Sequence, residues 1–135
     1  MKPAMPHLYI PVLFSAFMLI ATLAQAQISN TGNAKAGEKI YLKCRSCHVL
    51  DQPTNKMGPH LMNLMGRKAG NIEGFEYSAA MKAAGEDGLT WDEDSLKTFL
   101  SSPKTMIPNT SMRFWGLWEN QIDDLLAYLR EKQQD

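Results

Sequence analysis

Hydrophobic side chains recur at helical spacing in two segments near opposite ends of the chain. The first segment begins at Asn33, a favourable N-cap residue, and its core positions follow at steps of three or four: Ala36, Ile40, Tyr41, Cys44 and Cys47. The second segment, residues 119–132, carries one apolar stripe made of Ile122, Leu125, Leu126 and Leu129. The two patterns predict amphipathic helices that pack on each other, with Gly37 at a close crossing of their backbones.

Glycine and proline residues divide the middle of the chain into short elements. Short helices are predicted at residues 61–65, 78–84 and 91–100, with Thr90 and Glu93 as the capping box of the last one. Residues 102–116 are predicted to form a loop between two helices. Because strand-like alternation is nearly absent, the predicted fold class is all-α.

The first 26 residues have the pattern of a secretory signal peptide. Lys2 precedes an apolar run over residues 8–24, and Ala24-Gln25-Ala26 fits the small-x-small cleavage site. We therefore expect a signal peptide over residues 1–26, a flexible segment over 27–33 and one domain over 34–135. An uncleaved membrane anchor is the alternative, although the run is short for a bilayer span. In both cases the domain faces the exported side, which predicts a periplasmic location.

The charges of the chain are balanced, with 14 basic and 14 acidic side chains among 135 residues. Nothing in the sequence forms a basic stripe, so a nucleic-acid partner is excluded. A domain this small buries too little apolar surface to be stable without help. A large, flat cofactor would complete its core.

The candidate chemistry lies in the sequence Cys44-Arg45-Ser46-Cys47-His48. This C-x-x-C-H pattern is typical of c-type haem attachment, in which each thiol adds to one vinyl group and the histidine ligates the iron. A thioredoxin-like thiol pair would need a preceding strand, and a zinc site would need a fourth ligand, for which only His60 remains. A plain disulfide is a further alternative, but it leaves His48 without a role.

A second axial ligand would decide what such an iron can do. His60 is predicted to be a surface or packing residue, and methionines in short helices normally fill gaps. Met106 and Met112 lie in the 102–116 loop. Met112 is favoured because Pro108 and Asn109 form a turn that presents it inward. Phe114 and Trp115 are expected to close the pocket against water.

The residues from about 34 to 132 resemble class I cytochrome c, the small soluble type found in bacteria and mitochondria. The resemblance rests on C-x-x-C-H and on further segments in the family's order: Gly58-Pro59-x-Leu61, Gly66-Arg67-Lys68, Gly74-Phe75-x-Tyr77, Leu89-Thr90-Trp91, Pro103-Lys104, Ile107-Pro108-x-Thr110-x-Met112-x-Phe114 and Leu125-x-Ala127-Tyr128-Leu129. It implies a cytochrome c fold, with the N- and C-terminal helices crossing and short helices and loops wrapped around one covalently bound haem.

The resemblance also implies roles for individual residues. His48 and Met112 would be the axial iron ligands of a haem c held through Cys44 and Cys47, and the Pro59 carbonyl would support the His48 ring. The haem propionates would be held by three further residues, Arg67, Tyr77 and Trp91. Gly37 and Tyr41 would cross Leu125 and Tyr128.

Two departures from the family pattern make the expected distal pocket drier. Phe99 replaces a frequent tyrosine and Met81 a frequent asparagine, which should raise the reduction potential. The cations expected around the haem edge are few: Lys43, Lys56, Lys104, Arg45 and Arg113. Docking to an acidic partner should therefore be weaker or less dependent on salt.

The function that follows is a soluble, probably monomeric electron shuttle and not an enzyme, since no acid–base or nucleophile constellation is present. A cytochrome bc complex or a dehydrogenase would be the donor, and an oxidase or reductase the acceptor. Two alternatives stay open. A small haem peroxidase or gas sensor would need an open iron site and a polar distal residue. A haem subunit bound permanently to a dehydrogenase would share every feature above.

Overall fold

The computed structural model describes residues 32–133 of the chain. The expected signal peptide and most of the expected 27–33 segment lie outside these residues. The described chain forms the helices α1 (Ala34–Tyr41), α2 (Ala79–Glu86), α3 (Glu93–Ser101), α4 (Pro103–Met106) and α5 (Glu119–Lys132). Its β structure is one isolated bridge between Lys68 and Thr90. The prediction of an all-α fold is confirmed, and none of the described helices is long and apolar enough to cross a membrane.

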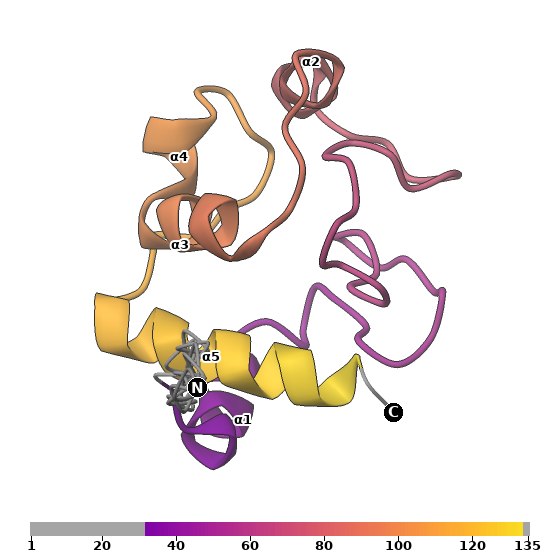
Figure 1. Cartoon of the computed structure of the whole chain (residues 1–135). Coiled ribbons are helices and arrows are strands. Elements are labelled where there is room, and N and C mark those ends of the chain that lie inside the picture. Colours follow the sequence, from indigo (N-terminus) through magenta and orange to yellow (C-terminus); the bar gives the residue numbers. More distant parts are fainter. Residues whose placement is uncertain (1–31, 134–135) are drawn as a thin grey trace, which may run out of the picture.

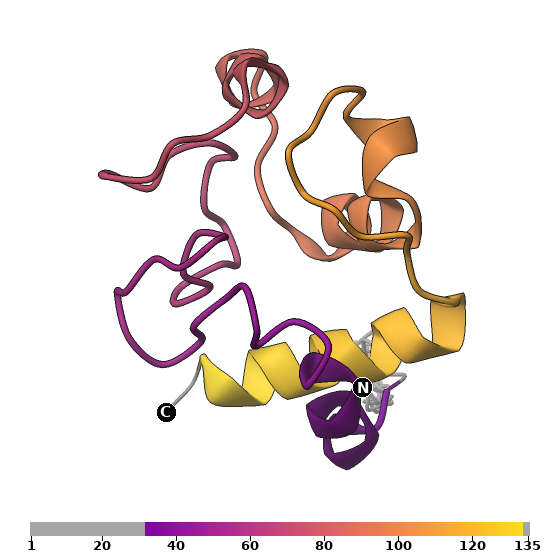
Figure 2. The ribbon, with the colours of Figure 1, turned by 180° about the vertical axis from the view of Figure 1, so that it is seen from behind.

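Helix α1 crosses α5 at one side of the molecule, and α2, α3 and α4 lie on the other (Figures 1 and 2). The crossing is made at Gly37, where any Cβ atom would collide with the main-chain carbonyl of Asp124 and with Tyr128. Asn33 caps α1, since its side-chain oxygen accepts the Ala36 N–H at 3.1 Å. Its own N–H donates to Asp124 Oδ1 at 2.7 Å. The predicted close packing of the two terminal helices is confirmed.

The first helix is shorter than its apolar pattern predicted. Regular α-helix ends at Tyr41, and residues 42–47 continue as turns. Within these turns the Cys44 N–H bonds to the Tyr41 carbonyl and the His48 N–H to the Cys44 carbonyl, at 2.8 and 2.9 Å. Apolar spacing of three and four residues is compatible with successive turns as well as with a helix, which explains the difference.

Helix α3 begins two residues later than predicted, and the predicted capping box of Thr90 and Glu93 is wrong. The cap is Asp92, whose carboxylate accepts the Ser95 N–H at 2.8 Å, while the Ser95 hydroxyl accepts the Asp92 N–H at 2.9 Å. Ser95 thus takes the part that a glutamate plays in the commoner box. Glu93 instead pairs with Arg130 of α5 at 2.8 Å.

Two further differences concern the short elements. Residues 61–65 form turns rather than the predicted helix, because Asn63 has a left-handed backbone with φ of 54°. The predicted 102–116 loop contains α4, which begins with Pro103 at a position where proline suits a helix. The predicted turn at Pro108 and Asn109 is present, closed by a 3.1 Å bond from the Thr110 N–H to the Ile107 carbonyl.

Candidate cofactor site

A cavity of about 660 Å³ lies between the two groups of helices. This volume is within the range of about 300–1,000 Å³ that is usual for cofactor and ligand sites. Most of its wall is apolar and is supplied by α3, by α5 and by the segments around residues 61 and 75: Leu61, Leu64, Phe75, Met81, Leu96, Phe99, Leu100, Leu125 and Leu129. Met81 and Phe99, the two residues expected to make the pocket drier, are among them.

The thiols of Cys44 and Cys47 line this cavity, and neither is in a disulfide. Burial, with a smaller contribution from Cys47, raises the pKa of Cys44 to about 11. Such a thiol is protonated at neutral pH, whereas a thioredoxin-type pair relies on a lowered pKa. No group of three or more metal-binding side chains occurs among residues 32–133. The arrangement thus favours cofactor attachment over the redox and zinc alternatives.

His48 lines the same cavity and is oriented by its neighbours. Its Nδ1 lies 2.7 Å from the Pro59 carbonyl oxygen, so the N–H on this nitrogen donates to Pro59. The other ring nitrogen is then left with a free lone pair, which is the form that ligates metals. Burial is the main cause that lowers the pKa of His48, and this keeps the ring neutral.

On the distal side the structure separates the two candidate methionines. Met112 lines the cavity and Met106 does not. Met112 follows Thr110, a buried residue of the cavity wall whose hydroxyl oxygen accepts the Met112 N–H at 3.4 Å. Phe114 lines the cavity as expected, but Trp115 is 95% exposed, so the prediction that it closes the pocket is wrong.

Arg67, Tyr77 and Trp91 also line the cavity. The Arg67 guanidinium donates to the carbonyls of Met62 and His60 at 2.9 and 3.0 Å, which fixes its position. Burial lowers the pKa of Arg67 and raises that of Tyr77. The site therefore offers a cation and a neutral hydroxyl within an otherwise apolar wall.

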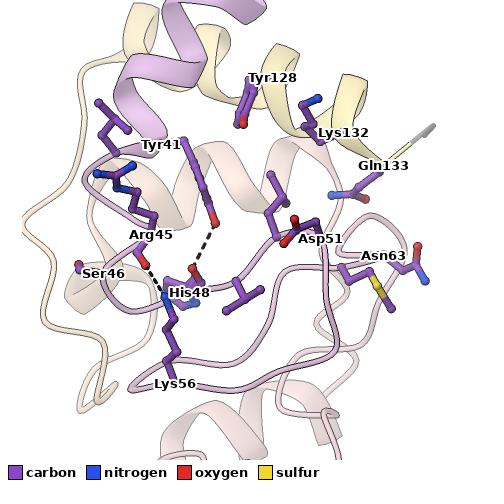
Figure 3. A pocket seen from close by; sticks show the side chains of 14 residues that line it. Tyr41, Arg45, Ser46, His48, Asp51, Lys56, Asn63, Tyr128, Lys132 and Gln133 are labelled. Carbon is purple, nitrogen blue, oxygen red and sulfur yellow. Dashed lines mark hydrogen bonds between the residues drawn. The ribbon is translucent and has the colours of Figure 1, made fainter.

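A second cavity, of about 1,030 Å³, lies beside His48 and between the 45–63 loop and the ends of α1 and α5 (Figure 3). There the Tyr41 hydroxyl donates to the His48 carbonyl at 3.2 Å, and Lys56 Nζ donates to the Arg45 carbonyl at 3.0 Å. Neither cysteine nor Met112 lines it, so it is not the site that the sequence predicted.

The cations expected around a cofactor edge are divided between different surfaces. Lys43 and Arg113 line the apolar cavity. Arg45 and Lys56 line the second cavity instead, and Lys104 lies over the ring of Trp115, 5.7 Å from its centroid. His60, predicted to be a packing or surface residue, is half-buried and lines neither cavity.

Sequence reasoning missed two contributors to the site. Thr110 was noted only as part of a motif, yet it is buried against Met112. The bond from Tyr41 to the His48 carbonyl was not foreseen either, because a tyrosine at a helical core position predicts packing and not a specific partner. The signal that could have found Thr110 is its place two residues before the expected ligand.

The chain matches the cytochrome c family over residues 34–133. It is 44% identical over 97 residues to cytochrome c2 of Afifella marina, which covers 70% of this chain and 78% of that protein. Cytochrome c2 of Blastochloris viridis is 37% identical over 126 residues, with coverage of 92% and 94%. Among solved structures, cytochrome cH from Methylobacterium extorquens is similar, with a TM-score of 0.67, 40% identity and coverage of 74% and 99%.

The likeness extends over both the sequence and the fold. The two cytochromes c2 are electron carriers rather than enzymes, and their similarity to this chain is far too extensive to reflect one short motif. The thiols, the neutral imidazole and the apolar walls of the cavity fit a haem c. The chain belongs to the cytochrome c family, whose members transfer electrons through a covalently bound haem c.

Proposed function

We propose that the protein carries single electrons in the periplasm, using one haem c attached through Cys44 and Cys47 with His48 and Met112 as axial ligands. The observation that carries this proposal is that all four side chains line one apolar cavity, although Met112 is remote from the other three in sequence. A site with both axial positions filled leaves no open position for a substrate, which suits a carrier. The polar distal residue that a peroxidase or sensor would need is replaced by Met112 and Phe114.

The protein's part is to hold the cofactor and tune it. When bound, the haem supplies an iron that changes its charge by one electron. His48 offers a nitrogen whose direction is set by the bond to Pro59, which also makes the ring a better donor. The Met112 thioether is a neutral, soft ligand that favours ferrous iron. The apolar neighbours Met81 and Phe99 act in the same direction, so we expect a high reduction potential.

Arg67, Tyr77 and Trp91 are proposed to hold the haem propionates. The support is that each lines the cavity and that Arg67 is already fixed by two carbonyls. A guanidinium next to a carboxylate forms a charge-assisted bond, and the low polarity around it strengthens the attraction. Tyr77 contributes a hydroxyl that stays protonated because burial raises its pKa.

The periplasmic location follows from the N-terminal segment. The alignment with the Blastochloris viridis protein covers 92% of this chain and therefore reaches into the first 31 residues. We expect export and cleavage after Ala26, so that the mature protein is a monomeric shuttle between a cytochrome bc complex or dehydrogenase and an oxidase or reductase. Mass spectrometry of the exported protein checks this, since an intact N-terminus would mean a membrane-anchored form.

Carbon monoxide binding tests the proposed ligands. Reduced wild-type protein should bind carbon monoxide poorly at neutral pH, because Met112 already occupies the position that the gas needs. Met112→Ala should bind it readily and lose the absorption band of the methionine–iron bond.

Met106→Ala is the matched control, since it removes a nearby methionine that does not line the cavity. It should keep both the band and the resistance to carbon monoxide. If Met106→Ala loses the band and Met112→Ala keeps it, the ligand is Met106. Ready binding by the wild type would contradict the carrier and favour the enzyme or sensor.

A further inference from the structure

Two tryptophans just before α5 lie almost entirely in solvent. Trp115 is 95% exposed and Trp118 is 80% exposed, and neither lines a cavity. Indole rings carry a large apolar surface that is normally buried, so two exposed ones close together in sequence point to a contact with another body. Two exposed cations lie beside them in the chain or in space, Arg113 and Lys104. We call these four residues the tryptophan surface.

The backbone holds the two rings outward on a fixed base. Leu117, between them, is buried, and its N–H donates to the Leu100 carbonyl at 2.9 Å. Gly116 has φ of 114° and approaches the Ser101 carbonyl so closely that a Cβ atom would collide with it. The segment is therefore fastened to the end of α3 at Gly116 and Leu117. The exposure of Trp115 and Trp118 is a consequence of this attachment and not of a loose loop.

The chain enters the described domain near this surface. Gly32 lies against Asp123, and Asn33 bonds to Asp124, in the second turn of α5. Trp118 is the N-cap of that helix, about 7.5 Å along its axis from Asp123. The apolar run over residues 8–24 is separated from Gly32 by residues 25–31, which span at most about 25 Å. A membrane that holds the run therefore lies within reach of the tryptophan surface.

We propose that the tryptophan surface binds the interface of a lipid bilayer that contains anionic lipid. Tryptophan favours the headgroup level of a bilayer, where the ring is partly buried and its N–H stays hydrated. Lys104 and Arg113 add attraction to negative headgroups, and Glu119 is the nearest exposed acid in sequence. Because Arg113 also lines the haem cavity, this contact brings that cavity close to the membrane surface.

The exit of the chain is what favours a bilayer over a protein partner. A partner protein could bind the same rings, but nothing would then relate its position to residues 8–24. The contact does not require the leader to remain attached, since indole burial and the two cations act in the mature domain. It goes beyond electron carriage, which would proceed in solution without it.

Vesicle flotation tests the proposal. The haem-loaded protein from residue 27 onward is suitable, since residues 32–133 form the packed unit that the solved relative covers over 99% of its length. The protein is mixed with vesicles of phosphatidylcholine, with or without phosphatidylglycerol, and the haem absorbance reports the bound fraction. The wild type should float with the mixed vesicles. Trp115→Ser with Trp118→Ser should lower the partition coefficient about tenfold or more.

Met57→Ser is the matched control, because Met57 is also 82% exposed but lies at the haem cavity. It should bind vesicles as the wild type does. All variants are first compared by circular dichroism and by the haem spectrum. The proposal is overturned if the wild type does not float, or if the double variant floats equally well. It is also overturned if the wild type self-associates, or binds a redox protein, through these tryptophans and ignores vesicles.

Discussion

His48 is held by three neighbours that act on different parts of the residue. Pro59 accepts the ring N–H, the Tyr41 hydroxyl donates to the main-chain carbonyl, and Gly58 lies so close to the ring that a Cβ atom would strike it. Each contact removes one freedom of movement from the proposed ligand. The result is a neutral imidazole with a fixed direction, which is what a rigid iron site requires.

Replacing Tyr41 with phenylalanine should test one of these contacts. The change keeps the ring and removes the hydroxyl, which leaves the His48 carbonyl without this donor. We expect the free energy of unfolding of the holoprotein to fall by about 1 kcal/mol, as measured by denaturant titration.

Tyr128→Phe is the control, because the two tyrosine rings pack together with centroids 5.7 Å apart. No hydrogen bond of the Tyr128 hydroxyl occurs within residues 32–133, so this variant should be almost as stable as the wild type. Equal losses in the two variants would mean that the His48 bond contributes nothing.

Helices α1, α3 and α5 form the frame that carries the site. Helix α1 meets α5 backbone to backbone at Gly37, and α3 is joined to α5 by the pairs Lys97–Asp123 at 2.9 Å and Arg130–Glu93 at 2.8 Å. The close crossing brings Cys44, just beyond α1, to the cavity wall that α5 supplies. The ion pairs are partly exposed, so they orient α3 more than they stabilise it.

The crossing can be tested with Gly37→Ala. The added methyl group must push against the Asp124 carbonyl and Tyr128, and main chain cannot yield as a flexible side chain does. We expect a loss of about 3 kcal/mol in the free energy of unfolding. Lys35→Ala, on an exposed position of the same helix, should change it little. A Gly37→Ala protein as stable as the wild type would show that the helices can separate without cost.

The cap of α3 predicts a dependence of stability on pH. The bonds from Ser95 hold the pKa of Asp92 below its ordinary 3.8. A carboxyl with a lowered folded-state pKa stabilises the protein above its unfolded pKa, and this contribution is lost as the pH falls through the folded pKa. The stability difference between wild type and Asp92→Asn should therefore shrink between about pH 6 and about pH 3.

Denaturant midpoints measured across this range check the expectation. Asp94→Asn, which removes one negative charge from the same turn without touching the cap, is the reference. If the two variants show the same pH dependence, the cap carboxylate is not the group responsible.

At the scale of the whole molecule, the cofactor cavity occupies the centre of the core. Leu64, Leu96, Phe99, Leu100 and Leu125 are buried in the core and line the cavity. Their packing partners on the cavity side would be the haem itself. A space of about 660 Å³ in the core of so small a domain cannot be tolerated without an occupant.

Preventing haem attachment should therefore unfold much of the molecule. In Cys44→Ala with Cys47→Ala the cofactor has no covalent link, and we expect a large loss of helical circular dichroism and of the cooperative thermal transition. Ser46→Ala, between the two cysteines, should keep both. A cysteine-free protein with native helicity and a sharp transition, but no haem, would show that the core is stable without its cofactor.

Much of the fold follows from local pattern. The amphipathic stripe of residues 119–132, the glycine at the helix crossing and the C-x-x-C-H sequence each depend on neighbours a few positions away, so they can be identified without a structure. The predicted helix at 61–65 and the capping box at Thr90 failed because a left-handed Asn63 and a competing cap at Asp92 override the simple pattern. Helix α4 is a single turn, too short for any periodicity.

The sequence by itself determined the family, the thiols, the imidazole and the two packing helices, because these are encoded in short-range spacing and order. Only the tertiary structure decided that Met112 lines the cavity and Met106 does not, that Trp115 faces solvent, and that Tyr41 bonds to His48. These facts depend on how segments distant in the chain are placed against one another. Spacing along the chain carries no information about that placement until the helices pack.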